Sequence, residues 1–416
     1  KNLDITLIES ANTLGGRART VMFDDVPVDN GQHIAIGGYR SMLSMLRRIG
    51  LDEERVFLRW PLKLDVRSND DAVQLNAPSL PAPLNLLLAF MNAKGLSRQE
   101  KTQTILNWSR LIKPVSDDMT VTDLLKHANQ AARVSHYLWE PLCLAAMNTP
   151  AETSSAVVFQ RVLKDAFGRK RKDSDLLIPR YDLGRVIPVP AQDYLKQKKI
   201  TIRTGDRVTN LLTEDGKITG VQMGYETLLA SHVIIATNPW SCAGLVEPVT
   251  ELNDLHSRLQ QFTYEPITTV YLKYSRAVLL HPAMLGLVDH SSQWLFDRRL
   301  TGLPKMIASI ISGDGAHMQM SRDEVASKVK SEVDKWRSDI GEPIDQLVIR
   351  EKRATFSATP AIEKLRPSNR TMLSGCWLAG DYTNTGYPST LEGAVMSGKL
   401  CAQEFIENKR INNNRD

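Results

Sequence analysis

The chain has 416 residues, 42% of them hydrophobic and 24% charged, which is typical of a water-soluble globular protein large enough for more than one domain. Its 52 basic residues only slightly outnumber its 47 acidic residues, so nucleic acid is not an expected partner. No segment contains the ~20 consecutive apolar residues of a membrane-spanning helix, and the four cysteines lie far apart without a Cys-x-x-Cys pair. We therefore expect no metal site, no disulfide framework and a reducing, cytoplasmic location.

The first predicted element is a buried parallel strand at residues 4–9, where a short apolar, β-branched run ends in an acid. A turn-rich segment follows this strand. Residues 41–49 then carry apolar side chains at helical spacing, and a glycine marks the end of the helix. Between residues 58 and 188, prolines separate apolar helical stretches such as 121–132 and 154–167, so we expect a mostly helical insertion.

Strand patterns return after this insertion. Residues 200–238 alternate between apolar and polar side chains around an Asp215-Gly216 hairpin turn, and residues 233–236 are typical of a buried strand. Further strands are predicted at residues 268–274, 306–312 and 377–381, and helices at 323–340 and 391–409.

These elements predict an α/β fold in which a nucleotide-binding sheet is interrupted twice by a second domain. We expect the last residues to form a polar tail without a packing face. The predicted sheet domain comprises residues 1–57, 186–245 and 352–409, the second domain residues 58–185 and 246–351, and the disordered tail residues 410–416.

One chemical motif follows the first strand. A carboxylate at the carboxyl end of such a strand suits the ribose hydroxyls of a dinucleotide, and Glu9 holds that position. Gly15 and Gly16 allow the backbone to approach a diphosphate, and Arg17 can pair with phosphate oxygens. Alone, a strand-terminal Glu is more often a solvated carboxylate, but the two glycines and the arginine favour a binding role.

A second motif lies near the end of the chain, where a predicted strand ends in Gly380 and Asp381. Its carboxylate could bind a polyol and its backbone a phosphate. The N-terminus of the helix that follows would place partial positive charge beside an electron-rich ring. An ordinary strand, loop and helix explains either motif alone, but it explains the two motifs together poorly.

Together the two motifs resemble the flavin-dependent amine oxidase and phytoene desaturase superfamily, over nearly the whole chain. A narrower set of motifs is similar to the hydroxysqualene dehydroxylases, the squalene-associated FAD-dependent desaturases of bacterial hopanoid pathways. These motifs are residues 29–33 (Asp-Asn-Gly-Gln-His), Gly37-x-Tyr39-Arg40, 139–143 (Trp-Glu-Pro-Leu-Cys), 148–150 (Asn-Thr-Pro) and 177–180 (Leu-Ile-Pro-Arg).

The resemblance implies a Rossmann-like FAD-binding domain with a second, mixed α+β substrate domain, and FAD bound without a covalent link. It also implies a Gly-x-Gly-x-x-Gly loop about 20 to 30 residues before the ribose acid. No room exists for this loop before Glu9, so we expect the natural protein to continue upstream. The implied FAD contacts are Glu9, Gly15, Gly16, Arg17, Val208, Gly380, Asp381, Tyr387, Pro388, Glu392 and Ala394.

The implied reaction is the reductive dehydroxylation of hydroxysqualene to squalene. In the resembling folds the segment that contains Asp29 and His33 runs near the flavin. His33 is a candidate acid for the departing hydroxyl, because an ordinary histidine titrates near neutrality, although a purely structural histidine is equally expected. Asp29 would either orient His33 or act as the acid itself if burial raised its pKa.

Other residues have structural and functional interpretations side by side. Tyr387 could form a wall of the substrate cavity, and Trp139 and Trp240 could line an isoprenoid tunnel, but large aromatic side chains are more often simple core. Cys376 is placed within a strand, so we expect a small buried side chain there rather than a covalent flavin link.

Peripheral membrane contact is also expected. Residues 78–96 form an apolar insert, and residues 169–172 (Arg-Lys-Arg-Lys) supply a basic run. Together they could rest on an anionic membrane surface, although each alone is more often core or solvated loop. The isoprenoid lipid substrate favours the membrane.

Two other functions remain open at this stage. A carotenoid-type desaturase or a flavin amine oxidase would run hydride transfer in the oxidative direction. A flavin-free lipid-binding protein would have lost the phosphate loop. The dehydroxylase needs an external electron donor, whose identity the sequence leaves open.

Overall fold

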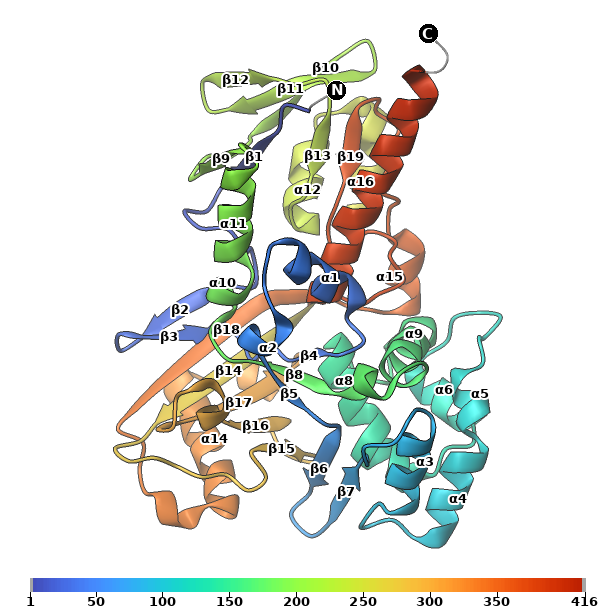
Figure 1. Ribbon diagram of the computed structural model, residues 1–416, viewed down its shortest axis with the longest axis vertical. Helices are drawn as coiled ribbons and strands as arrows, with labels where there is room; N and C mark the ends of the chain where they lie inside the picture. Colours follow the sequence, from blue (N-terminus) through green and yellow to red (C-terminus); the bar gives the residue numbers. More distant parts are fainter. Residues whose placement is uncertain (1–2, 414–416) are drawn as a thin grey trace.

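Two pairs of short parallel strands lie at one end of the molecule (Figure 1). The computed structural model describes residues 3–413. Strand β1 (Thr6–Glu9) pairs with β9 (Thr201–Thr204), and β13 (Val233–Ile235) pairs with β19 (Cys376–Leu378). These are the predicted strands of the nucleotide-binding part, and both acid-bearing segments follow the carboxyl ends of their strands.

Helices pack along these strand pairs. Helix α16 (Leu391–Asn413) lies beside β19, where Phe405 contacts the Trp377 ring edge-on at 5.9 Å. Residue Ile234 of β13 is 48% exposed, so the expectation of a completely buried strand at 233–236 was wrong at this position. The exposure is confined to β13, because all three residues of β19 are buried.

An antiparallel meander and its flanking helices complete this part. The predicted hairpin turn is confirmed, because Asp215 and Gly216 both have positive φ between two paired strands, the geometry of a type I′ turn. The elements are β10 (Asn210–Glu214), β11 (Lys217–Met223), β12 (Glu226–Leu229), α10 (Leu183–Val186), α11 (Pro188–Gln197), α12 (Pro239–Val246), α13 (Asn253–Gln260) and α15 (Pro360–Leu365).

A seven-stranded mixed sheet forms the centre of the second part. Helix α14 (Arg322–Trp336) covers one of its faces, and its valines pack against the valines, leucines and isoleucines of the sheet. The strand order is β18 (Asp345–Phe356), β14 (Tyr264–Lys273), β17 (Met306–Ser312), β16 (Trp294–Asp297), β15 (Met284–Leu287), β6 (Lys63–Arg67) and β7 (Ala72–Asn76).

The sheet revises two sequence-based expectations. The hairpin of β6 and β7 belongs to this sheet, so the segment 58–188 is not uniformly helical. These strands have five residues each, too few for their alternation to stand out between helical patterns. The domain boundary expected at residue 351 also falls inside β18, which continues to Phe356.

The helical insertion is real between these strands and β8 (Leu176–Pro179), and it lies at the end of the molecule away from the parallel strand pairs (Figure 1). The Ser155 hydroxyl accepts the Val158 N–H and caps its last helix. The insertion comprises α3 (Leu84–Met91), α4 (Arg98–Leu106), α5 (Trp108–Ile112), α6 (Val121–His127), α7 (Ala132–Val134), a π-helical turn (Ser135–Trp139), α8 (Glu140–Met147) and α9 (Ala156–Phe167).

Short elements join the two parts and carry residues 29–36 between them. Strand β4 pairs with β8, which pairs with β5, and β2 forms a hairpin with β3. These elements are β2 (Thr20–Phe23), β3 (Val26–Asp29), β4 (Ala35–Ile36), α1 (Arg40–Arg48), α2 (Glu53–Val56), β5 (Phe57–Trp60) and β8 (Leu176–Pro179).

The ends of two helices differ from expectation. Helix α14 ends at Trp336 and not at residue 340, and α16 continues through Asn413. The tail expected at residues 410–416 is therefore helical over its first four residues, and residues 414–416 lie outside the described residues. Within residues 3–413 no helix is long and apolar enough to cross a bilayer.

Candidate active site

A partly buried ion pair joins the two predicted binding motifs. The Arg17 guanidinium lies 2.6 Å from a carboxylate oxygen of Asp381, 364 residues away, and Ser389 donates to the same oxygen. Asp381 is only 4% exposed. Burial acts to raise its pKa, but Arg17 and Ser389 outweigh burial and hold the pKa below its usual value. The carboxylate is therefore ionised at neutral pH.

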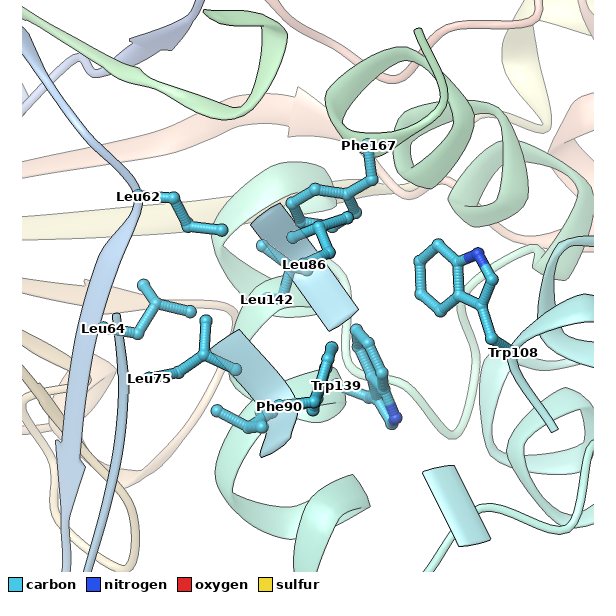
Figure 2. A pocket seen from close by; sticks show the side chains of 10 residues that line it. Leu62, Leu64, Leu75, Leu86, Phe90, Trp108, Trp139, Leu142 and Phe167 are labelled. Atoms are coloured by element: carbon cyan, nitrogen blue, oxygen red, sulfur yellow. The ribbon is translucent and has the colours of Figure 1, made fainter. Parts of the chain in front are cut away.

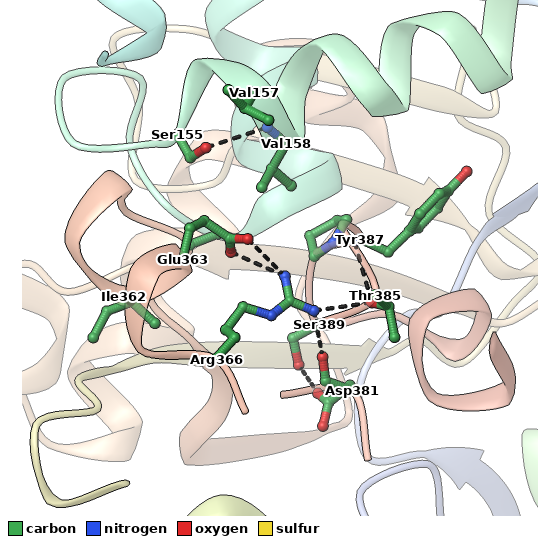
Figure 3. Close-up of polar contacts among 12 residues, drawn as sticks. Ser155, Val157, Val158, Ile362, Glu363, Arg366, Asp381, Thr385, Tyr387 and Ser389 are labelled. Carbon is green, nitrogen blue, oxygen red and sulfur yellow. Dashed lines mark hydrogen bonds and ion pairs between the residues drawn. The ribbon is translucent and has the colours of Figure 1, made fainter. Parts of the chain in front are cut away.

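A second arginine, Arg366, holds the loop that follows Asp381. Its buried guanidinium donates to the carbonyl oxygens of Asp381 and Thr383 at 3.0 Å and to the Thr385 hydroxyl at 2.9 Å, and pairs with Glu363 (Figure 3). Sequence reasoning missed Arg366, because the pattern around it carries no sign of its distant partners. It fixes the backbone that the second motif offers to a cofactor.

The predicted pair Tyr387 and Pro388 is buried at the end of this loop. Tyr387 donates its hydroxyl to Asp165 of α9, and its ring meets Tyr39 edge-on at 6.4 Å. Burial and the Asp165 carboxylate raise the pKa of Tyr387 well above its usual value. A Cβ at Gly393 would lie 2.7 Å from the Pro388 carbonyl oxygen, so α16 begins close against the loop.

Glu9 and Val208 lie in neighbouring segments, as their predicted roles require. The Glu9 carboxylate accepts the Ala11 N–H at 2.8 Å and is only partly buried. Its carbonyl oxygen accepts the Asp206 N–H at 3.2 Å, which places the loop with Val208 beside the end of β1. The carboxylate remains accessible for the hydroxyls of a ribose.

The two glycines of the first motif differ in their surroundings. Gly15 has φ +118°, and a Cβ there would meet Pro188 at 2.7 Å, so the turn packs against the start of α11. Gly16 has φ +59° with no atom within 4 Å of a Cβ position, and Gly386 in the second motif is similarly open at φ +67°. Backbone without side chains thus borders open space near Arg17, which fits a diphosphate.

Three further predicted cofactor residues lie around α16. Gly380 donates its N–H to the Ser397 hydroxyl at 2.8 Å, and Ala394 is exposed. Both carboxylate oxygens of Glu392 accept backbone N–H groups at the start of α1, from Ser41 at 2.8 Å and Met42 at 2.7 Å. The Glu392 side chain therefore caps α1, a correction to its expected role, and only its backbone is left for a cofactor.

Residues 29–33 lie directly beside the first motif. Asn30 donates its side-chain N–H to the Arg17 carbonyl oxygen at 2.8 Å, and its amide oxygen lies 3.4 Å from His33 Nε2. The Asp29 carboxylate accepts the Leu183 N–H at 2.7 Å. The structure thus brings both predicted catalytic residues close to the predicted cofactor residues.

Burial shifts both catalytic candidates toward their neutral forms. It raises the pKa of Asp29 to about 6, although the Leu183 N–H and Arg298 oppose this change. It lowers the pKa of His33 to about 4. His33 is therefore a neutral imidazole at pH 7, which corrects the expectation that it titrates near neutrality, while the condition set for Asp29 as an acid is met. Sequence reasoning missed Arg298, which donates to Gln32.

An apolar pocket lies on the insertion side of this site (Figure 2). Helix α9 links the two, because it carries Phe167 into the pocket wall and Asp165 to Tyr387. Trp139 lines the pocket and is 2% exposed, which fits both the tunnel and the core interpretation, whereas the Trp240 ring lies edge-on against the Tyr264 ring, outside the pocket lining. The lining residues are Leu62, Leu64, Leu75, Leu86, Phe90, Trp108, Leu138, Trp139, Leu142 and Phe167, and the cavity between these side chains is narrow, about 20 Å³.

The remaining candidates have structural surroundings. Cys376 is 1% exposed within β19, and burial raises the pKa of its thiol to about 11, so it has the surroundings of an inert core residue. Within the described part of the chain, no three His, Cys, Asp or Glu side chains are grouped in a way that could hold a metal ion.

Comparison with known proteins decides the family. The family model of flavin-containing amine oxidoreductases matches residues 1–406. The chain belongs to this family. It is 26% identical to the hydroxysqualene dehydroxylase of Rhodopseudomonas palustris, over 96% of this chain and 92% of that protein. It is 22% identical to the 15-cis-phytoene desaturase of Solanum lycopersicum, over 97% of this chain and 74% of that protein.

Solved structures show the same fold. An oxidoreductase from Methanosarcina mazei aligns with a TM-score of 0.73 at 13% identity, over 96% of this chain and 94% of that one. The cyclohexylamine oxidase of Brevibacterium oxydans aligns with a TM-score of 0.66 at 15% identity, over 96% and 93%. The predicted FAD-binding α/β fold is thereby confirmed.

The chain is an FAD-dependent oxidoreductase of this family, and the flavin-free lipid-binding alternative is set aside. The residues present fit the cofactor: Glu9 suits the adenosine ribose, the open backbone at Gly16 beside Arg17 suits the diphosphate, and Asp381 suits a polyol.

We predict that Glu9→Ala weakens FAD binding by roughly 1 to 3 kcal/mol, because the hydrogen bonds between its carboxylate and the ribose are lost. Titration of the deflavinated protein with FAD measures the change. Glu247→Ala, which removes an exposed carboxylate of the same part, is the matched control. Equal affinities of the two variants would remove Glu9 from the site.

Asp29 should also make stability depend on pH. Its pKa in the folded protein, about 6, lies above the ordinary 3.8. The stabilisation of the folded protein by the proton on Asp29 is therefore complete below about pH 4 and is lost as pH rises through about 6. Asp29→Asn removes this loss. Relative to wild type, the variant should gain up to roughly 3 kcal/mol between about pH 4 and about pH 7, measured by urea unfolding.

The control for this series is Asp25→Asn, which changes an exposed aspartate of the same hairpin. Asp25 has φ +60°, a conformation that asparagine also adopts readily. A constant difference between Asp29→Asn and wild type across this pH range would show that Asp29 titrates normally.

Proposed function

We propose that the protein removes the hydroxyl group of hydroxysqualene reductively to give squalene, as in hopanoid biosynthesis. The observation that carries this proposal is an apolar pocket whose wall shares helix α9 with the predicted cofactor site. Ten leucine, phenylalanine and tryptophan side chains line it, which suits a hydrocarbon chain and no charged group. The buried segment 29–33 of the same site supplies polar groups for a single hydroxyl.

The relatives support this substrate class. Three of them, from Rhodopseudomonas palustris, Sinorhizobium fredii and Zymomonas mobilis, are named hydroxysqualene dehydroxylases, and the alignment spans 92% of each. The phytoene desaturases are spanned to about three quarters. Both names describe enzymes of long isoprenoids.

In this mechanism, FAD when bound supplies the hydride and accepts electrons from an external donor of unknown identity. The chain's residues do the rest. The pocket side chains exclude water and align the hydrocarbon. Neutral His33 contacts the hydroxyl as a hydrogen-bond partner, and Asp29, which holds a proton below about pH 6, is the proton source for the departing oxygen.

The second candidate function is oxidative, a phytoene-type desaturase. The same apolar pocket accepts a carotenoid precursor, so the pocket alone favours neither direction. The segment 29–33 separates them: a hydrocarbon substrate presents no oxygen to the buried polar groups there. An amine substrate is less suitable, because no carboxylate lies among the pocket-lining residues to pair with its charge.

We predict that hydroxysqualene oxidises the reduced, FAD-loaded enzyme in a single turnover and yields squalene. The rate should fall as pH rises through about 6, because Asp29 then loses its proton. Stopped-flow flavin absorbance and product analysis measure both. A fall near pH 4 would assign the proton to His33. Reduction of the oxidised enzyme by squalene or phytoene, with no reaction of the alcohol, would establish a desaturase instead.

We also propose peripheral attachment to the cytoplasmic face of a membrane. Helix α3 turns Leu86 and Phe90 into the pocket and leaves Leu84, Leu87 and Met91 exposed by 51%, 37% and 53%. These three side chains recur at helical spacing, so they form one apolar stripe directly over the pocket. A lipid bilayer is the occupant that also stores the substrate.

Basic residues lie close to the same region. In the predicted run 169–172, Arg171 pairs with Asp175 at 3.2 Å, which reduces the free charge, while Arg169, Lys170 and Lys172 are exposed or partly exposed. The run follows Phe167 of the pocket wall. The charge available to an anionic surface is therefore smaller than the sequence implies.

We predict that the double substitution Leu87→Ser and Met91→Ser lowers partitioning onto anionic vesicles by about tenfold or more, because apolar area is no longer buried in lipid. Sedimentation of protein with vesicles measures this. The control is Tyr225→Ser with Leu229→Ser, two exposed side chains at the opposite end (Figure 1). Similar binding of both double variants would contradict attachment through α3. Added salt should weaken the wild-type binding modestly.

A further inference from the structure

Thr269 is a buried polar residue that the cofactor motifs do not involve. It lies in the middle of β14, is 0% exposed, and its hydroxyl has no hydrogen-bond partner among the described residues. A buried hydroxyl without a partner is unfavourable, and native proteins keep few of them. Eleven side-chain atoms of this kind occur among the described residues, so the unpaired hydroxyl of Thr269 becomes informative through its position beside residues 29–33.

The face of β14 that carries Thr269 contacts residues 29–33, the segment that contains Asp29 and His33. Thr269 and Tyr271 share this face, while Val270 packs toward α14. Tyr271 donates its hydroxyl to the Asp29 carbonyl oxygen at 2.9 Å. Two residues along, Thr269 faces Gly31. The strand and the segment therefore run alongside each other at two successive contacts.

Gly31 brings the hydroxyl of Thr269 and the ring nitrogen of His33 close to the same point of the backbone. A Cβ placed on Gly31 would lie 3.7 Å from the Thr269 hydroxyl oxygen and 3.8 Å from His33 Nε2. Both are ordinary van der Waals distances. Because glycine has no side chain, these two polar atoms lie beside bare backbone.

We infer that Thr269 and His33 together bind the hydroxyl group of an isoprenoid alcohol and make the enzyme select the alcohol over the hydrocarbon. An alcohol oxygen donates one hydrogen bond and accepts others, so it can satisfy both groups at once. A hydrocarbon leaves the buried Thr269 hydroxyl unpaired and His33 Nε2 with the Asn30 amide oxygen alone, at 3.4 Å, and sites of this kind discriminate against ligands that lack the hydroxyl. Thr269 acts here as a specificity residue for the proposed dehydroxylation, on which the inference rests.

Recognition of the hydroxyl group by Thr269 and His33 also explains how the product would leave. Once the oxygen has departed, the hydrocarbon product makes no hydrogen bond to Thr269 or His33. Its affinity falls relative to that of the substrate, although both fill the same apolar pocket. Discrimination and release then follow from the same two polar atoms.

The test compares the affinities of hydroxysqualene and squalene for the oxidised, FAD-loaded enzyme, followed by the perturbation of the flavin absorbance. Thr269→Val keeps the shape and removes the hydroxyl. It should reduce the preference for the alcohol by roughly 5- to 30-fold through weaker alcohol binding, with squalene binding unchanged or tighter. Thr269→Ser should retain the preference.

Thr268→Val is the matched control, because Thr268 is equally buried on the neighbouring position and contacts Met318 instead. It should leave the preference unchanged. A separate readout needs no ligand: Thr269→Val should raise the melting temperature of the ligand-free protein by roughly 1 to 3 °C, since it removes an unpaired buried hydroxyl.

An unchanged preference in Thr269→Val would overturn the inference, and a lower melting temperature with it would make Thr269 structural. A different result would reject the proposed function: the wild-type enzyme neither binds nor turns over the alcohol. In that case the inference about Thr269 is rejected as well. Wild-type turnover of the alcohol together with an unaltered Thr269→Val preference rejects the inference alone.

Discussion

The ion pair between Arg17 and Asp381 is the contact on which the rest of the site depends. It connects a loop after the first strand with a loop after the last, 364 residues later. The Arg17 side chain is 30% exposed and that of Asp381 only 6%, so removing Arg17 would leave a buried carboxylate without its cation, which is destabilising. The pair therefore holds both loops in place, and Ser389 and Arg366 position their backbone around it. A dinucleotide meets a site that is already organised.

Burial and charge pairing shift the pKa values differently at this ion pair and at residues 29–33. Asp381 stays ionised because a cation lies against it, whereas burial moves Asp29 and His33 toward their neutral forms. At neutral pH Asp381 is therefore ionised and His33 is neutral, while Asp29, with a pKa of about 6, is still mostly ionised near the Arg298 cation. The ten side chains that line the apolar pocket carry no charge. These differences arise from burial and pairing.

Local patterns predicted the parts of the structure that depend on near neighbours. The strand ending in Glu9, helix α1, the Asp215-Gly216 turn and the strand before Asp381 all follow from short-range spacing. Contacts between distant segments were not accessible in this way. Arg366 under its loop, the Tyr387 link to α9 and the Thr269 position depend on which segments meet in space. The contacts of the Glu392 carboxylate were inaccessible for the same reason, because its partners are backbone N–H groups of another helix.

The site also shows where the chain departs from ordinary core packing. An unpaired hydroxyl at Thr269 and a buried acid at Asp29 both oppose stability, and such exceptions are expected where function requires them. Amine-oxidising enzymes share this fold, yet a fold does not determine the substrate. An ammonium group in the pocket would lose its hydration without meeting a carboxylate. A long hydrocarbon with one hydroxyl satisfies the apolar lining and the two polar atoms together, which is the physical reason to favour an isoprenoid alcohol.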